Sequence, residues 1–210
     1  MRKFLLGSTL SAVAAVALLA ATSASATTLA TISDTTGQQL GNGPFTLGWE
    51  FQANTAEIVT ALGAFDDSQD GLNESHDVGL WDANGVLLAS TTIASGTGAA
   101  LINQFRYNSV APVTLVAGQD YFIGAVWLDG ADPMVFAATG LTTDPSITYL
   151  SSAYIAGGTL TDPTFLDGGL GGYFGPNLIG STVPEPLSLS LFGAGLAGAA
   201  AIRRRKKSVV

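Results

Sequence analysis

The feature that most constrains the fold is the shortness of the apolar runs between residues 30 and 180, each of which ends at a turn signal. In the stretch 45–51 (FTLGWEF), apolar and polar residues alternate as in a strand with one buried face. No part of 30–180 repeats apolar residues at the 3.6-residue period of an amphipathic helix. The pattern therefore predicts an all-β fold, an antiparallel β-sandwich of the jelly-roll or immunoglobulin-like type. Further candidate strands lie at 58–65, 78–81, 86–89, 105–107, 113–115, 121–127 and 146–155.

Turn residues connect several of these runs. Asn84-Gly85 separates two of them and predicts a tight hairpin. The sequence 117–120 (AGQD) predicts a turn into 121–127, which is apolar enough for a central strand. The glycine-rich stretch 157–180 leaves two possibilities open. It contains a last strand near 173–174, or it forms a flexible lead into the C-terminal segment.

The first 26 residues have the organisation of a secretory signal peptide. Arg2 and Lys3 precede an apolar run at 4–21, and Ala24-Ser25-Ala26 offers small residues at a cleavage site. We expect signal peptidase to cut after Ala26. The mature protein would then begin with a domain at 27–180, followed by a separate C-terminal segment at 181–210.

The C-terminal segment has three parts in a fixed order. Val183-Pro184-Glu185-Pro186 comes first, then the uncharged and mostly apolar stretch 187–202, then five basic residues at 203–207. As a helix, 187–202 would be about 24 Å long, which is short for a bilayer core of roughly 30 Å. The basic cluster would stay on the cytoplasmic side. These residues predict a segment that associates with the inner membrane, either as a plain C-terminal anchor or transiently.

This order of parts resembles the PEP-CTERM sorting signal of exported proteins from Gram-negative bacteria and cyanobacteria. The resemblance implies that an exosortase recognises the segment and cuts near Pro184-Glu185-Pro186. The prolines hold that peptide extended, so a processing enzyme can bind it. A secreted or cell-surface location in a Gram-negative bacterium is the expected result.

The charge of the domain excludes one class of partner. Between residues 27 and 183, Arg106 is the only basic residue against fifteen acidic ones, a formal charge of −14. Nucleic-acid binding requires clustered lysine and arginine, so we expect no nucleic-acid partner. The chain has no cysteine, which excludes thiol catalysis and thiolate metal sites.

The densest polar cluster is the stretch 66–77 (DDSQDGLNESHD). Its oxygen-bearing residues have the spacing of a twelve-residue calcium loop, with Gly71 at the turn. The last position is an aspartate instead of the usual bidentate glutamate, and the flanks are expected strands instead of helices. A solvated acidic loop is the alternative interpretation. The candidate Ca²⁺ ligands are Asp66, Ser68, Asp70, the carbonyl of Leu72, Glu74 and Asp77.

Single residues add little to these patterns. His76, the only histidine, is adjacent to Asp77 and near Glu74, but a lone histidine beside a strand is more often a structural hydrogen-bonding residue than an acid–base catalyst. We expect Arg106 to pair with a carboxylate at the edge of the core. The tryptophans at 49, 81 and 127 lie in apolar strands, which favours core packing over sugar binding.

The segment 58–90 resembles a β-sandwich domain of unassigned function found among PEP-CTERM proteins. The shared features are an apolar strand ending in Phe65-Asp66, the acidic loop, Ser75-His76, and the strand and turn that follow. The resemblance continues to about residue 130 and implies no established activity. We therefore expect a structural or adhesive protein of the exopolysaccharide or biofilm matrix, and not an enzyme. A carbohydrate-binding module is the alternative, and a secreted hydrolase is the least favoured class.

Overall fold

The structure, a computed structural model, describes residues 25–34, 38–40, 43–128, 130–136, 138–168, 172–183 and 195. Residues Ala24–Val183 form one compact unit. The described part of this unit is nearly all-β, and its strand pairs are antiparallel, as the sequence predicts. Its strands are β1 (Thr27–Thr28), β2 (Ala30–Asp34), β3 (Gln38–Leu40), β4 (Phe45–Ala53), β5 (Glu57–Phe65), β6 (His76–Asp82), β7 (Leu87–Ile93), β8 (Ala100–Ile102), β9 (Phe105–Leu115), β10 (Asp120–Trp127), β11 (Met134–Phe136), β12 (Thr139–Thr143), β13 (Ile147–Ala156), β14 (Phe165–Asp167), β15 (Tyr173–Phe174) and β16 (Pro176–Thr182).

The larger sheet has the strand order β14-β13-β4-β10-β6-β7. Its centre is β4, which pairs with β10 on one side and β13 on the other. The Asn84-Gly85 hairpin joins β6 to β7 as expected, and Gly85 takes the positive φ of 78° that such turns require. The expected central strand at 121–127 is β10, which lies between β4 and β6.

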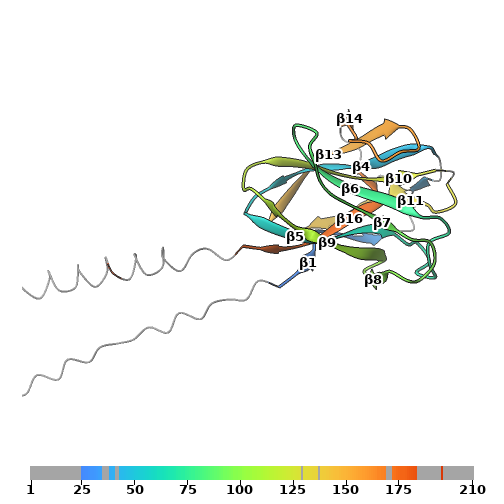
Figure 1. Cartoon of the computed structure of the whole chain (residues 1–210), viewed down its shortest axis with the longest axis horizontal. Coiled ribbons are helices and arrows are strands. Elements are labelled where there is room, and N and C mark those ends of the chain that lie inside the picture. The colour runs from blue at the N-terminus through green and yellow to red at the C-terminus, as the bar shows by residue number, and fades with distance from the viewer. Residues whose placement is uncertain are drawn as a thin grey trace, which may run out of the picture. The chain divides into compact units, whose positions relative to one another are not determined.

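The second sheet has the order β1-β16-β5-β9-β8 and faces the first (Figure 1). Its third strand, β5, pairs with β9 on one side and β16 on the other. Of the two possibilities for 157–180, the strand near 173–174 is confirmed as β15, and β16 follows it within the second sheet. The two expected strands at 105–107 and 113–115 are one continuous strand, β9. Smaller sheets join β15, β11 and β3, and β12 with β2.

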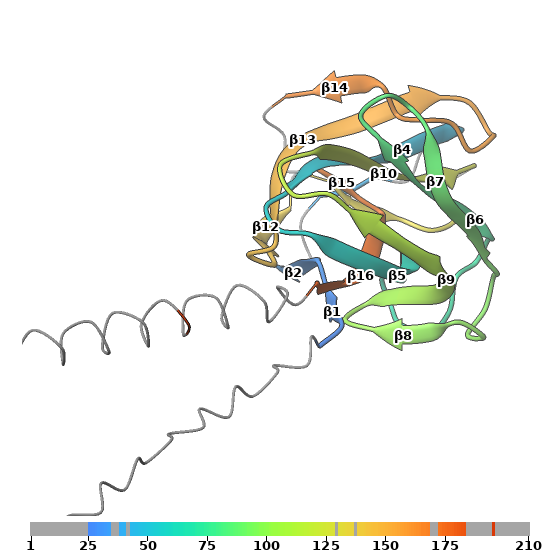
Figure 2. The ribbon, with the colours of Figure 1, turned by 60° about the vertical axis from the view of Figure 1, so that its left-hand side comes forward.

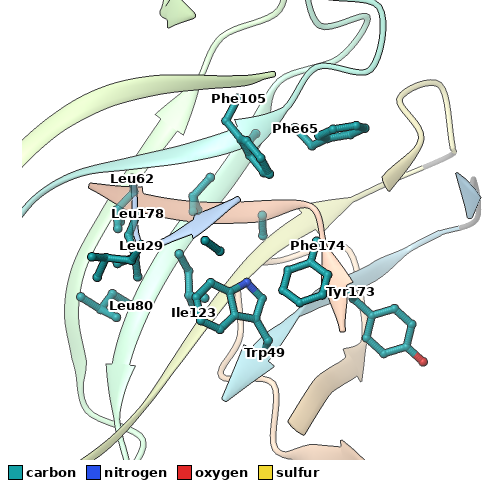
Figure 3. Close-up of a cluster of buried hydrophobic side chains, with 14 of the residues drawn as sticks. Leu29, Trp49, Leu62, Phe65, Leu80, Phe105, Ile123, Tyr173, Phe174 and Leu178 are labelled. Atoms are coloured by element: carbon teal, nitrogen blue, oxygen red, sulfur yellow. The ribbon is translucent and has the colours of Figure 1, made fainter. Parts of the chain in front are cut away.

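The hydrophobic core lies between the two main sheets (Figure 3). Trp49 on β4 and Phe174 on β15 are fully buried, with ring centroids 5.8 Å apart. The indole nitrogen of Trp49 donates a hydrogen bond to the carbonyl of Pro176 on β16 at 3.1 Å. Fully burying a large apolar side chain contributes roughly 1.5–3 kcal/mol. Trp49 therefore adds both apolar burial and a polar link between β4 and β16.

The outer face of β4 is also covered, which the alternating pattern did not predict. Thr46 is fully buried, although its position in the pattern is a polar, solvent-facing one. Its hydroxyl donates to the carbonyl of Thr159 at 3.3 Å and accepts from the backbone N–H of Thr161 at 3.3 Å. The segment after β13 thus crosses the outside of the sheet and buries this end of β4.

Candidate functional site

The acidic loop between β5 and β6 is organised by a buried arginine. Arg106 on β9 donates from Nε to Oδ2 of Asp66 at 2.6 Å, and both side chains are nearly inaccessible to solvent. Arg106 is thus paired with a carboxylate at the core edge, as expected from the sequence. The guanidinium also donates to three carbonyls in the surrounding loops, those of Gln69, Thr97 and Ala99.

These contacts give the loop its shape without an ion. Oδ2 of Asp66 also accepts the backbone N–H of Gly71 at 3.1 Å, which closes the turn at the middle of the loop. Gly71 has a φ of 117°, a conformation that side-chain-bearing residues rarely adopt. The sequence predicts that Ca²⁺ neutralises the acids of this loop. At Asp66, the positive charge is supplied by Arg106 instead.

The structure directs the six predicted calcium ligands to different partners. The Leu72 carbonyl accepts the N–H of Gly96 at 2.7 Å, and Asp77 lies on β6, where it accepts the hydroxyl of Thr92 at 2.6 Å. Glu74 accepts the N–H of Leu128 at 3.2 Å. Asp66 is bound to Arg106, whereas Ser68 and Asp70 are exposed. The six-ligand calcium site stays a prediction that this conformation does not assemble.

A different group of side chains does come together. One ligand atom each from Glu74, His76 and Asp132 lies within 4.8 Å of the others, the one such group found among the described residues. Glu74 lies at the end of the acidic loop and His76 is the first residue of β6. Asp132 lies in the connection between β10 and β11. The group therefore joins the acidic loop to a segment that is more than fifty residues away.

His76 is fully buried, and both nitrogens of its ring are engaged. Nδ1 lies 2.8 Å from the carbonyl oxygen of Val126, and Nε2 lies 3.0 Å from Oδ2 of Asp132. The indole of Trp127 covers the ring at a centroid distance of 4.4 Å. No substrate could reach this imidazole from solvent without a rearrangement, so the contacts agree with the structural interpretation of His76.

Asp132 accepts hydrogen bonds at both carboxylate oxygens. Oδ1 accepts hydrogen bonds from the backbone and side-chain amides of Asn73 at 2.8 and 3.0 Å. Oδ2 accepts a hydrogen bond from the backbone N–H of Glu74 at 2.8 Å and also faces Nε2 of His76. Burial opposes ionisation of this carboxyl, but the hydrogen bonds from His76, Asn73 and Glu74 outweigh it and lower its pKa to about 2. The Asp132 carbonyl accepts the indole N–H of Trp127 at 2.7 Å, which fixes the backbone.

Asp132 is the functional candidate that sequence reasoning missed. It is 56 residues from His76, and no motif surrounds it. The Asp132-Pro133 pair after an apolar strand indicates only a turn. Its role depends on the pairing of β6 with β10, which brings the connection after β10 to the start of β6.

The tryptophans are not available for stacking on a sugar. Trp49, Trp81 and Trp127 are 0%, 4% and 0% exposed. Core packing, the favoured interpretation, is confirmed for Trp49 and Trp127, whereas Trp81 is buried but lies outside the core cluster. The exposed aromatic of the described surface is instead Phe165 on the edge strand β14, with 58% exposure.

The predicted processing sites are adjacent in sequence to the ends of the compact unit. Thr27 in β1 pairs with Gly180 in β16 (Figure 2). The backbone N–H of Val183 donates to the carbonyl of Ala56 at 2.9 Å, so the hydrogen-bonded structure continues to the residue before Pro184. Ala26 is exposed, whereas Ala24, Pro184, Glu185 and Pro186 lie outside the described residues. The expected helix at 187–202 also lies outside them, apart from Gly195. Within the described part of the chain, no helix is long and apolar enough to cross a membrane.

Comparison with known families matches two parts of the chain. Residues 30–166 match a domain of unknown function (DUF4082), and residues 182–206 match the PEP-CTERM protein-sorting motif. None of the curated proteins compared with the chain matches it. The sorting motif indicates an exported protein that an exosortase processes, targeted for secretion or to the cell envelope. The match at 30–166 covers more than half of the chain, so the chain belongs to the DUF4082 family.

Proposed function

We propose that the mature protein is a non-catalytic β-sandwich module, displayed outside the cell as a structural or adhesive component of an exopolysaccharide or biofilm matrix. The observation that carries this proposal is the pairing of β1 with β16, which brings both ends of the compact unit together. Signal peptidase would cut before Thr27, and an exosortase would cut after Val183, near the paired strands. If the exosortase transfers the cut C-terminal end to the cell surface, the domain is held at that end and presents its remaining surface to the surroundings.

The expected processing sequence follows from the two terminal signals. Cleavage after Ala26 would release the N-terminus during export from a Gram-negative cytoplasm. The apolar stretch 187–202 would then hold the chain in the inner membrane until the exosortase cuts at Pro184–Pro186. Intact-mass measurement of the extracellular protein tests this sequence. A dominant species that retains 203–207 would indicate a plain membrane anchor instead.

The non-catalytic assignment is supported by the burial of the histidine and of the Arg106–Asp66 pair. The sole histidine is fully buried and fixed by two contacts. Arg106 and Asp66 are also buried and bind each other. Groups with these contacts stabilise a fold more readily than they transfer protons to a substrate. Turnover of any substrate from a panel of glycans and esters would contradict the assignment.

A carbohydrate-binding module is the second candidate, and Phe165 favours it. The Phe165 ring is exposed and lies 5.8 Å from the ring of Tyr154 at an interplanar angle of 32°. Asp167, two residues later, accepts the hydroxyl of Tyr173 at 3.0 Å. Exposed aromatic rings beside carboxylates provide both stacking and hydrogen bonding.

Co-sedimentation of the purified protein with the organism's own extracellular polysaccharide tests both candidates. Specific binding that is lost in Phe165→Ala supports the carbohydrate-binding module. Val116→Ala is the matched control, because Val116 is also 58% exposed and apolar. Retention in the matrix that is the same in both variants supports a structural role, and absence of retention contradicts the matrix assignment.

A further inference from the structure

The contact between His76 and Asp132 requires a positive charge between two acceptor atoms. The partner of Nδ1 is the Val126 carbonyl, which only accepts hydrogen bonds, so Nδ1 carries a proton. In the neutral ring Nε2 then has a lone pair, which points at Oδ2 of Asp132 from 3.0 Å. Two lone pairs at this distance repel each other. A proton or a metal ion between them removes the repulsion.

The surroundings are those of a metal-binding histidine. Histidine ligands usually donate their second N–H to a carbonyl or carboxylate, which fixes the ring and its tautomer. Val126 performs this role for His76. Oδ2 of Asp132 is oriented by the N–H of Glu74, and the Asp132 backbone by the indole of Trp127. Both candidate ligand atoms are therefore positioned by a second set of hydrogen bonds.

Glu74 supplies a third ligand. Its carboxylate is within 4.8 Å of the other two ligand atoms, and the side chain is partly exposed. Its hydrogen bond from Leu128 is long, at 3.2 Å, so a small rotation of the side chain costs little. Glu74 is the most exposed of the three residues, so an ion would approach the buried pair from its side, with a small rearrangement.

We propose that Glu74, His76 and Asp132 bind one divalent transition-metal ion, with Zn²⁺ the best fit to the donor set. One imidazole nitrogen and two carboxylate oxygens suit Zn²⁺, whereas Ca²⁺ and Mg²⁺ prefer sites built from oxygen alone. Two ligands of a tetrahedral zinc are about 3.3 Å apart, given metal–ligand distances near 2.0–2.1 Å. The gap between Nε2 and Oδ2 therefore has to widen by only a few tenths of an ångström.

This ligand set differs from that of the predicted calcium loop, and the zinc proposal does not depend on the proposed matrix function. It shares Glu74 with the calcium ligand set, but His76 and Asp132 are not members of that set. A bound ion would connect the end of the acidic loop with the segment between β10 and β11. It would act as a crosslink in a domain without disulfides.

The first experiment uses the single histidine as a reporter. The full chain, carrying no histidine tag and purified in mild detergent, is labelled with ¹⁵N and titrated with ZnCl₂. We expect one ion to bind per chain, a large shift of the Nε2 resonance, and retention of the proton on Nδ1. Since His76 is the only histidine in the sequence, all ring signals come from one residue, and Nδ1 and Nε2 are distinguished by their couplings to the ring protons. Zinc binding without a change at Nε2 would place the ion elsewhere and overturn the proposal.

The second experiment compares variants by equilibrium dialysis and thermal unfolding. Glu74→Gln keeps the acceptor for Leu128 and should fold, yet its zinc affinity should fall at least about tenfold. Asp132→Asn should abolish binding, and its melting temperature without metal shows whether it is folded. Asp70→Asn is the control, because Asp70 is an exposed acid of the same loop. Equal zinc affinity in Glu74→Gln and Asp70→Asn would show that Glu74 is not a ligand, and no wild-type binding below about 1 mM would show that only a proton bridges His76 and Asp132. Either result overturns the three-ligand proposal.

Discussion

Replacement of Arg106 by methionine should destabilise the domain strongly. The variant keeps most of the apolar stem but removes the charge that pairs with Asp66 at 2.6 Å. The carboxylate of Asp66 then stays buried without its charged partner, and it keeps the hydrogen bond from the Gly71 N–H. Removing one partner of a buried ion pair costs about 3–5 kcal/mol. Since domains of this kind have a free energy of unfolding of about 5–15 kcal/mol, the loss is a large part of the total stability.

Urea denaturation followed by tryptophan fluorescence measures this loss as a fall in the transition midpoint. The slope of the transition should stay unchanged, because the fold itself is retained. For a domain of this size, the melting temperature should fall by roughly 6–20 °C. Arg106→Lys should recover only part of the stability, because lysine cannot reach Asp66 and the three carbonyls together.

Two comparisons separate the ion pair from general packing. In Asp66→Asn combined with Arg106→Met, the buried charge is absent, so the double variant should be less destabilised than the two single losses added together. The loss in Arg106→Met should also change little in 0.5 M NaCl, because salt screens buried pairs weakly. A loss below about 1 kcal/mol, or full additivity, would refute the argument that Arg106 organises the loop.

Three other changes test separate parts of the structure. Burial raises the pKa of Glu57, so the folded state disfavours its deprotonation; its stabilising contribution is present below the unfolded pKa of about 4.5 and is lost as the pH rises through the folded pKa. Glu57→Gln should therefore raise the free energy of unfolding by about 1 kcal/mol at pH 7 and by less at pH 4. Urea titrations at the two pH values measure this difference. Asn177→Ala should cost about 2–3 kcal/mol, because this fully buried amide bonds both backbone groups of Ala30, and unchanged stability would show that water replaces it. Glu185→Ala should prevent removal of the C-terminal segment without changing the melting temperature, and normal release of this variant would show that the exosortase does not recognise Glu185.

Local patterns located most of the longer strands, because alternation and turn chemistry act over a few residues, but they did not predict β2, β12 or β16. The runs that became β4 and β10 were identifiable, and Asn84-Gly85 located a hairpin. The middle of β9 was missed because its residues do not alternate cleanly, and its pairing with β5 contains a register shift between Val59 and Ala61. The pairing of β1 with β16 is invisible to local patterns, since it joins the two ends of the domain.

The candidate sites show the same limit more clearly. The spacing of acids in 66–77 matched a calcium loop, but spacing does not reveal a positive charge supplied from elsewhere in the chain. Arg106 is 40 residues from Asp66 and is brought beside it by the pairing of β5 with β9. In the same way, His76 was noticed as a lone histidine, and Asp132, which determines its chemistry, was not.

The position of β16 has a consequence for the order of events during synthesis and export. This strand lies between β1 and β5, and it is made from the last residues before the sorting motif. The first strand of the unit has no neighbour in its sheet until Ile179 and Gly180 have left the ribosome and the export channel. The second sheet therefore cannot be completed until the end of the domain has been synthesised. A chain truncated before Pro176 lacks both β16 and the sorting motif. Every chain that the exosortase can recognise therefore contains the residues that complete the second sheet.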